Sequence, residues 1–475
     1  MIVILAALIL FVAVILVRTA GFQPKAQHEN STDAVEFDKE KAVSNLAELI
    51  KCKTVSYSDP SLEDDAEFEK LIEKLPGLYP NVFASCEFTR LPDRGLLFRW
   101  PGKSSEEPAV MMAHYDVVPA DEAKWDKPAF KAIIEDGVMW GRGTLDTKGT
   151  FNGALFAADT LISQGFVPAR DVYFAFSGGE EVSGNGAVNI VNLFREKGIT
   201  PGVVLDEGGA VVENVFPGVK APCGLIGIAE KGMINAQYRV QSSGGHASAP
   251  KPNMPVDTLA KTCLKVVKHP FKMHLTKPVA EMFDTLGRHS TFLYRMIFAN
   301  LWCFGWVLDL LGKTSGGEMN ALLRTTVAFT QMEGSSAANV IPPEAKMVAN
   351  MRLNPADTVE SALEYLKKTV NDQRVEITAL EASEPSRISR TDCDGWDRVA
   401  AAVAETWPGC IVSPYLMVQC SDSRHWGAIS DKVYRFCAMD LTAEERATIH
   451  GNNERIRLEC IHRAVEFYIR LMKKC

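Results

Sequence analysis

Acidic and histidine side chains follow several short apolar runs of the sequence. They are His114, Asp116, Glu180, Glu181 and Asp206. Each run has the length of a strand, and an open α/β sheet binds its ligands at the carboxyl ends of its strands. We therefore expect these side chains to meet in one crevice, although the chain separates them widely.

Two further residues with metal-binding chemistry precede expected helices: Asp146 in GRGTLDTKG and His450 in IHGNNE. Imidazole together with several carboxylates suits Zn²⁺ and accepts Co²⁺ or Mn²⁺ in its place, whereas Mg²⁺ does not need imidazole. A single acid after a strand is often a helix cap, and a lone histidine is often structural. Because the clusters occur together at strand ends and loops, a metal site is the better interpretation.

The apolar pattern predicts an α/β sheet with crossover helices in the first half of the chain. The expected strands are 96–100, 109–113, 172–176 and 202–205, and the expected helices are 37–51, 152–164 and 187–195. From about residue 228 the order becomes strand, helix, two strands, helix, strand, over 233–241, 256–267, 324–331, 346–353, 359–369 and 375–380. This is the order of a small ferredoxin-like domain. Helices at 396–406 and 457–473 then return to the first unit.

Composition limits the classes of partner. The chain has 475 residues and a net charge of -8, so it lacks the basic surface that phosphate neutralisation needs, and we expect no nucleic-acid partner. Its 11 cysteines form no C-x-x-C pair, which argues against a zinc finger and against a dense disulfide scaffold. One or two disulfides remain compatible with the spacing.

Residues 1–17 form an uninterrupted apolar run that Arg18 closes. Its length lies between that of a signal-peptide core and that of a spanning helix. No basic residue precedes the run, and residues 19–21 are a poor cleavage site. An uncleaved membrane anchor is therefore favoured over a cleaved signal, which would give a secreted protein. Arg18 and Lys25 follow the run, so the side of the membrane that the body faces stays open.

Seven motifs occur in order along the chain: HYDVVP, GRGTLDTKG, LDEGG, GGHASAP, NVIPP, SDSRHW and IHGNNE. Over residues 37–473 the sequence resembles the co-catalytic zinc aminoacylase/carboxypeptidase metallopeptidase family, and within it carboxypeptidase S and the N-fatty-acyl-amino acid synthase/hydrolases. The resemblance implies an α/β catalytic domain, with a mixed sheet flanked by helices, and an inserted ferredoxin-like α+β lid or dimerisation domain. The chain would then divide into a membrane anchor or signal segment at 1–18, a tether at 19–36, a catalytic domain at 37–227 and 382–475, and the lid domain at 228–381.

The resemblance also implies two zinc ions per chain. Their ligands would be His114, Asp146, Glu181, Asp206 and His450. Asp146 would bridge both ions, His114 and Asp206 would complete the first site, and Glu181 and His450 would complete the second. Two cations about 3.5 to 4 Å apart lower the pKa of a shared water to about 7 and polarise the scissile carbonyl.

The resemblance implies that two neighbouring carboxylates assist the metal ions in the reaction. Asp116 would orient His114, because a carboxylate on the far imidazole nitrogen fixes the tautomer. Glu180 matches the family's general base, which takes a proton and passes it to the leaving amine. Relatives often carry Asp where this chain has Thr147 and Gly179, but neither difference removes a ligand.

Other residues are implied to contact the substrate. His246 resembles a lid histidine that steadies the oxyanion, often in the site of a partner subunit, which implies a homodimer through the lid; a turn histidine is the ordinary alternative. Arg352 resembles the arginine that grips a terminal carboxylate with its planar fork. Asn339 is a companion donor, and Arg424 is the next candidate.

Two segments bear on substrate choice. Residues 418–420 replace glycines common in relatives, so the pocket wall is expected to differ. The segment 269–317 is longer than a basic lid requires and is rich in Phe, Leu and Trp. Its charged residues argue against a spanning helix. It either packs as the core of an enlarged lid or forms an apolar wall that accepts acyl chains or touches the membrane.

These features predict a two-zinc hydrolase that cuts the amide bond of an N-acyl-amino acid or small peptide beside a free C-terminal carboxylate. A di- or tripeptidase that needs a free N-terminus is the alternative within this class. An inactive membrane-tethered binding protein is the alternative from another class, and the presence of all five ligands and Glu180 disfavours it. The acyl group, the amino acid and the direction of reaction stay open.

Overall fold

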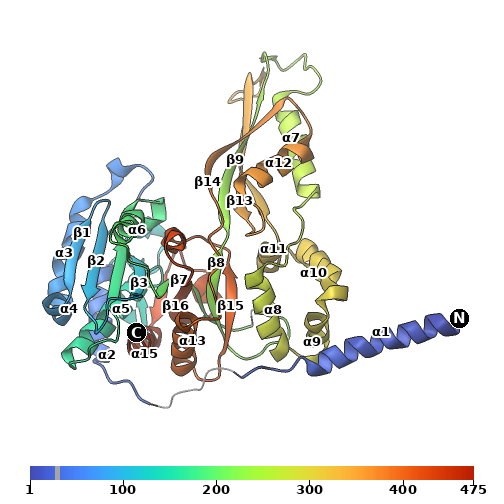
Figure 1. The fold of residues 1–475 in the computed structure, drawn as a ribbon. Coiled ribbons are helices and arrows are strands. Elements are labelled where there is room, and N and C mark those ends of the chain that lie inside the picture. Colours follow the sequence, from blue (N-terminus) through green and yellow to red (C-terminus); the bar gives the residue numbers. More distant parts are fainter. Residues whose placement is uncertain (27–32, 215) are drawn as a thin grey trace.

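A mixed eight-stranded sheet forms the centre of the larger unit of the chain, in a computed structural model that describes residues 1–26, 33–214 and 216–475. The strand order is β1-β2-β6-β3-β7-β16-β8-β15 (Figure 1). The strands are β1 (Glu87–Leu91), β2 (Gly95–Trp100), β3 (Ala109–His114), β6 (Val172–Ser177), β7 (Val203–Val212), β8 (Cys223–Glu230), β15 (Ile411–Met417) and β16 (Val433–Leu441). Because β3 pairs in parallel with both β6 and β7, the residues that follow these strands emerge at one edge of the sheet.

Helices cover both faces of this sheet, which explains why its central strands are continuous apolar runs. Phe98 and Met111 share a core with the helices α2 (Lys39–Ile50), α5 (Lys148–Ser163), α13 (Asp394–Thr406) and α15 (Leu458–Met472). The alternate residues Leu97 and Val110 pack against α6 (Gly186–Glu196) on the other face. The predicted mixed sheet flanked by helices is confirmed.

A four-stranded antiparallel sheet with the order β11-β13-β9-β14 forms the second unit, drawn above the first in Figure 1. Its elements are β9 (Gly232–Gln241), α7 (Pro255–Lys268), β11 (Thr326–Glu333), β13 (Glu344–Leu353), α12 (Val359–Val370) and β14 (Val375–Ser383). Alternate residues of β9, such as Ile234 and Tyr238, are buried with residues of α7 and α12. The predicted ferredoxin-like order is confirmed.

Four helices are inserted between α7 and β11. They are α8 (Lys277–His289), α9 (Phe292–Ala299), α10 (Leu301–Ser315) and α11 (Gly317–Leu323). Helix α8 belongs to the core, because Val279 and Phe283 pack with residues of β8 and β15. Helices α9 and α10 instead leave large side chains exposed, including Trp302 and Trp306. The segment therefore combines core packing with an exposed apolar surface.

The N-terminal helix α1 (Ile2–Gly21) projects from the body beside α9 (Figure 1). It is long and apolar enough to cross a membrane. Spanning anchors and signal sequences share this property. The predicted tether at 19–36 includes residues 27–32, which lie outside the described residues.

The cysteines make no disulfide in the structure. All of them are free thiols, and several, such as Cys52 and Cys460, are buried. Buried thiols of this kind pack as small apolar side chains.

The buried carboxylate of Glu454 joins a segment near the C-terminal end of the chain to a loop from the first half of the larger unit. It forms an ion pair with Arg142 at 2.6 Å, and both side chains are buried. It also accepts hydrogen bonds from the backbone N–H groups of Gly143 at 3.0 Å and Leu145 at 2.8 Å. Glu454 precedes β17 (Arg455–Arg457), whereas its partners lie in the loop between β5 (Val138–Trp140) and α5.

We expect Glu454→Gln to lower the free energy of unfolding by about 3–5 kcal/mol, because it leaves the buried Arg142 cation without its counter-charge. The matched control is Glu444→Gln, since Glu444 pairs with Arg455 at 2.6 Å but is 81% exposed. That change should cost less than about 1 kcal/mol. Urea titration followed by circular dichroism measures both. Equal losses in the two variants would contradict a special role for the buried pair.

Candidate metal centre

The C-terminal ends of β3 and β6 and the middle of β7 meet the loop before α5 and the loop before β17. They bring together His114, Asp116, Asp146, Glu180, Glu181, Glu207 and His450. Glu180 and Glu181 begin the short 3-10 helix η3 (Glu180–Val182), which directly follows β6. The expected convergence is therefore present for His114, Asp116, Glu180 and Glu181, whereas Asp206, expected after the end of a strand, lies inside β7, which continues to Val212.

Asp146 lies between two histidines. One carboxylate oxygen is 2.9 Å from Nε2 of His114, and the other is 2.8 Å from Nε2 of His450. The peptide bond between Asp146 and Thr147 is cis. A carboxylate that directs one oxygen to each of two imidazoles has the geometry needed to bridge two adjacent cations.

Glu181 lies beside His450 on the second side of Asp146. Its Oε2 is 3.1 Å from Nε2 of His450. Its Oε1 is buried and has no hydrogen-bond partner among the described residues. Hydrogen bonds to Asp146 and Glu181 raise the pKa of His450 to about 10. The two carboxylates therefore favour a positive charge at this point.

His114 is buried at the other side of Asp146. Its Nδ1 lies 3.0 Å from the backbone carbonyl of Asp116 and 3.4 Å from the Asp116 carboxylate, which leaves Nε2 directed at Asp146. Burial opposes protonation of His114, but the nearby carboxylates of Glu207, Asp116 and Asp146 outweigh it and raise the pKa well above the ordinary value. This side of the cluster also favours a positive charge.

Asp116 holds the turn that carries the paired glutamates. Its carboxylate accepts hydrogen bonds from the N–H groups of Glu180 and Glu181, both at 3.2 Å. One buried side chain thus fixes the position of η3 and also contacts His114.

Two carboxylates, Asp206 and Glu207, lie in the middle of β7 near His114. Glu207 Oε1 is 3.6 Å from His114 Nε2, and Glu207 groups with His114 and Glu180 closely enough for one ion. Asp206 is buried, and its Oδ2 accepts a hydrogen bond from the N–H of Ser423 at 2.9 Å. Glu207 was not among the predicted site residues; its place directly after Asp206 in LDEGG was the available signal.

Glu180 occupies a strongly negative environment. Desolvation raises its pKa well above the ordinary value; His114 opposes this effect, and the carboxylates of Asp422, Glu181 and Asp146 add to it. Asp422 is buried and accepts a hydrogen bond from Ser177 at 2.5 Å, and burial raises its pKa to about 7.

Two further predicted residues, His246 and Asn339, lie away from this cluster. His246, in β10 (Gly245–His246), is exposed and pairs with β12 (Val340–Ile341). Asn339 is also exposed, and its carbonyl accepts a hydrogen bond from the N–H of Ala247 at 3.0 Å. No contact between described residues joins either one to the histidine and carboxylate cluster. The two residues instead lie together on adjoining segments of the second unit.

Arg352 and Arg424 approach the cluster through Cys420. Arg352, in β13, donates a hydrogen bond to Sγ of Cys420 at 3.3 Å. Arg424, in the 3-10 helix η4 (Asp422–Ala428), and Arg352 both act electrostatically on the Cys420 thiol. Burial, with the nearby Arg352 cation, lowers the pKa of Lys231 to about 7. Neither Arg352 nor Lys231 has an ion-pair partner within the described ranges.

A cavity of about 450 Å³ opens beside the metal-binding cluster. Its charged side chains include Asp146, Glu180, Glu207 and His450, and Cys420 and Gln419 form another part of its lining. Its apolar lining is Leu145, Val212, Leu225, Met417, Met439, Leu441 and Ile449. Glu318 and Arg446 also line it, so the cavity combines charged side chains with a large apolar surface.

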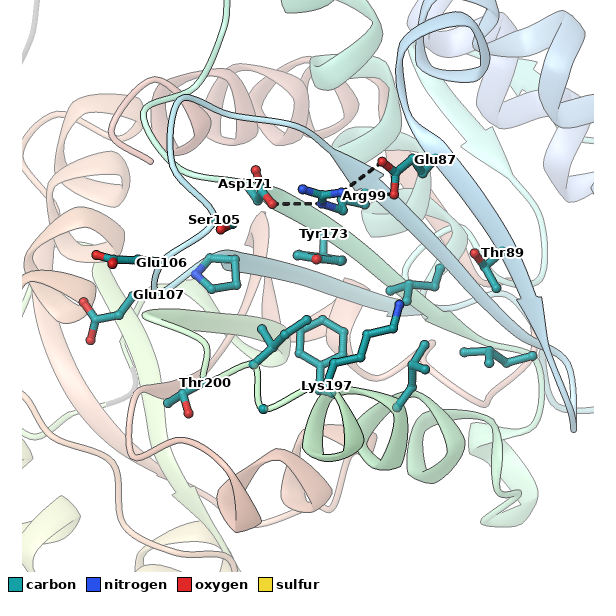
Figure 2. Close-up of a pocket in the computed structure, with 17 residues that line it drawn as sticks. Glu87, Thr89, Arg99, Ser105, Glu106, Glu107, Asp171, Tyr173, Lys197 and Thr200 are labelled. Atoms are coloured by element: carbon teal, nitrogen blue, oxygen red, sulfur yellow. Dashed lines mark hydrogen bonds and ion pairs between the residues drawn. The ribbon is translucent and has the colours of Figure 1, made fainter.

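A second cavity, of about 780 Å³, lies elsewhere and contains none of the predicted site residues (Figure 2). Arg99 lies there between Glu87 and Asp171, each at 2.9 Å. Its central charges are already paired with one another, so it offers no comparable site for an ion.

The residues present fit a pair of metal ions. His114, Asp146 and Glu181 place one ligand atom each within 4.8 Å of one another, and so do His114, Glu180 and Glu207. Imidazole nitrogens and carboxylate oxygens are suitable zinc ligands. The unpartnered buried oxygen of Glu181 and the raised pKa values of both histidines are the features that a bound cation would satisfy.

Similar proteins are known. The sequence is 34% identical to a probable carboxypeptidase S-like protein of Dictyostelium discoideum, over 90% of this chain and 84% of that protein. It is 33% identical to an N-fatty-acyl-amino acid synthase/hydrolase of Xenopus tropicalis, over 99% of this chain and 93% of that protein. The fold matches the crystal structure of an M20 family metallo-carboxypeptidase from Sulfolobus solfataricus, with a TM-score of 0.67, 18% identity and coverage of 91% of this chain and 98% of that chain.

Residues 110–474 match the Peptidase family M20/M25/M40. The match includes every residue of the histidine and carboxylate cluster. The chain belongs to the Peptidase family M20/M25/M40 and is a metal-dependent hydrolase.

Proposed function

We propose that this enzyme uses two zinc ions to hydrolyse the amide bond of an N-acyl-amino acid or small peptide beside a free C-terminal carboxylate. The observation that carries the proposal is the position of Cys420, which lines the cavity of the metal-binding cluster and also accepts a hydrogen bond from Arg352. A guanidinium is thus available beside the cavity. The names of the similar Dictyostelium and Xenopus proteins support the same substrate class.

Five residues would hold the metal ions. We assign His114, Asp146 and Asp206 to one ion, and Asp146, Glu181 and His450 to the other. The central position of Asp146 between the two histidines supports this division. Bound there, the ions would activate a water molecule and polarise the scissile carbonyl.

Glu180 would move the proton in this reaction. It is adjacent to Glu181, lines the cavity and has a raised pKa, so it can accept a proton and return it to the leaving amine. Asp116 would position both glutamates through the two backbone hydrogen bonds that it accepts.

Arg352 would recognise the terminal carboxylate of the substrate. Arg352 has no ion-pair partner among the described residues, and an unpaired guanidinium favours an incoming anion. Arg352 is only half-buried, so a ligand can reach it. Asn339 and Arg424 are secondary candidates for the same contact.

The apolar wall of the cavity supports an acyl group as the other part of the substrate. A di- or tripeptidase would have to stabilise the ammonium group of a free N-terminus. Glu318 is the lining carboxylate outside the metal-binding cluster, whereas aliphatic side chains such as Val212 and Leu225, which form more of the lining, are unsuitable for a charge. An N-acyl chain gains free energy when it is buried against them.

We further propose that α1 anchors the enzyme in a membrane and that the second unit forms a homodimer contact. The length and apolarity of α1 support the anchor. The exposed positions of His246 and Asn339 support a role in a partner subunit's site, because neither contacts the chain's own metal-binding cluster among the described residues.

Glu180→Gln should keep the metal content and lower kcat by about 10² to 10⁴, the usual contribution of a positioned acid–base group. The amide preserves the shape of the side chain but cannot accept the proton. The control is Glu196→Gln, at the exposed end of α6, which should leave kcat unchanged. Steady-state kinetics and metal analysis are measured together; near-normal kcat with full metal content would reassign the base.

Asp206→Asn should reduce the bound metal from two ions per chain towards one, whereas Glu207→Gln should retain both. The two carboxylates are adjacent on β7, so each variant is the matched control of the other. Mass-spectrometric metal analysis of protein reconstituted with Zn²⁺ measures the difference. The reverse result would make Glu207 the ligand.

Arg352→Lys should lower kcat/KM for N-acyl-amino acids by about 10- to 150-fold, because the charge remains but the bidentate fork is lost. The kcat/KM for the corresponding C-terminal amides should change little. The control is Arg239→Lys on the neighbouring strand β9, where the arginine pairs with Glu344. Equal losses on acids and amides would give Arg352 a structural role.

A further inference from the structure

The bent helix pair α9–α10 carries an exposed apolar face. Phe292 and Leu293 are each 61% exposed, Trp302 is 58% exposed and Trp306 is 67% exposed. Leu310 and Leu311 extend this face along α10. Large contiguous apolar patches on a protein surface mark a site of interaction with another molecule or with a membrane.

This face continues directly onto α1. Asn300, at the bend between α9 and α10, donates hydrogen bonds to the carbonyl of Ile15 at 3.3 Å and to Oγ1 of Thr19 at 3.2 Å. Arg18 Nε donates to the carbonyl of Ala299 at 3.3 Å. The ring of Trp302 contacts Phe11 edge to face at 5.7 Å. The pair therefore packs against the C-terminal half of the candidate membrane helix.

These contacts fix how deep the pair would lie in a bilayer. Phe11 is about ten residues from the end of α1, or about 15 Å along a helix, which is about half of the hydrocarbon thickness. Trp302 would then lie at a similar depth within one leaflet. The bend of 111° between α9 and α10 is suited to a segment that enters and leaves on the same side.

Cations surround the end of α1 where lipid headgroups would lie. The Arg288 guanidinium lies 4.3 Å from the ring centroid of Phe22, and Arg295 donates a hydrogen bond to Gln23 Oε1 at 3.2 Å. Arg18 and Arg295 form no ion pair with any other described residue. Arginines at this level complement the phosphates of a bilayer, while long apolar stems remain in contact with its interior.

We propose that α9–α10 is a re-entrant membrane wedge whose exposed apolar face is embedded in the leaflet around the C-terminal half of α1. The occupant of this face is the lipid bilayer. The inference rests on the membrane anchoring proposed for α1, and it adds a second attachment that belongs to the body of the enzyme. Because α11 follows α10 directly and contributes Glu318 to the lining of the cavity, the wedge also brings the cavity wall close to the bilayer.

The test uses the full chain in phosphatidylcholine vesicles whose acyl chains are brominated towards their methyl end, at the depth expected for Trp302, since bromine quenches tryptophan fluorescence on contact. The other tryptophans are buried or half-buried. Quenching should be clear in the unaltered chain and mostly lost in Trp302→Phe/Trp306→Phe. The control variant Trp140→Phe should keep it, because Trp140 belongs to the small sheet of β4 (Ile133–Glu135), β5 and β17.

Flotation of the same vesicles separates this inference from the anchoring by α1. Protein that floats, with equal quenching in the double variant and the unaltered chain, would overturn the wedge and leave the anchor standing. Protein that does not float would overturn both. Protein that floats as a dimer, with Trp302 and Trp306 shielded from bromine, would assign the face to a second copy and also overturn the wedge.

Discussion

The buried carboxylate of Glu454 is the constraint on which the metal centre depends. It lies in the loop that carries His450, and it binds the backbone of the loop that carries Asp146, more than 300 positions earlier in the chain. Arg142 compensates its charge at 2.6 Å. This connection adds to the antiparallel pairing of β17 with β5, which also joins the two segments, in setting the distance between His450 and Asp146. The two metal-binding halves are thus aligned by a residue that itself has no place among the proposed ligands.

A concentration of negative charge is the second requirement of the site. Asp116, Asp146, Glu180, Glu181 and Glu207 lie close together, and two histidines are their nearest positive partners. The raised pKa values of Glu180 and Glu207 reflect the cost of desolvating carboxylates beside one another. Binding of two divalent cations would relieve this repulsion, so metal binding and stability of the site are thermodynamically linked.

The sequence predicted the mixed sheet and the ferredoxin-like unit because both leave strong local patterns. The central strands are covered on both faces and read as continuous apolar runs, whereas β9 alternates because one face is open. The proximity of the ligand residues followed from their positions at parallel strand ends. Each strand, and the acid or histidine at its end, could be recognised from residues close together in the chain.

The unpredicted parts depend on tertiary contacts. In the sequence, Glu454 has no feature that separates it from a solvent-exposed acid in a loop, because its partners are backbone groups far away in the chain. Glu207 likewise cannot be distinguished, without the fold, from a solvent-facing neighbour of Asp206. The segment 269–317 was equally ambiguous, because its apolar composition is compatible with a core and with a surface. Its division arises from the position of α8 against β15: Phe298 and Leu308 keep one side of α9 and α10 in the core, and the large side chains on their other side are exposed.

The position of the inserted helices connects chemistry with location. Helix α8 is fixed to the sheet that carries the metal centre, α9 and α10 pack against α1, and α11 lines the cavity through Glu318. One inserted segment therefore contacts the catalytic sheet, the candidate membrane helix and the substrate cavity. An amphiphilic substrate has its carboxylate in water and its acyl chain in an apolar phase. In the proposed membrane arrangement, a cavity whose wall adjoins α9–α10 receives such a molecule with little exposure of the acyl chain to water, which reduces the hydrophobic cost of transferring the chain from lipid to protein.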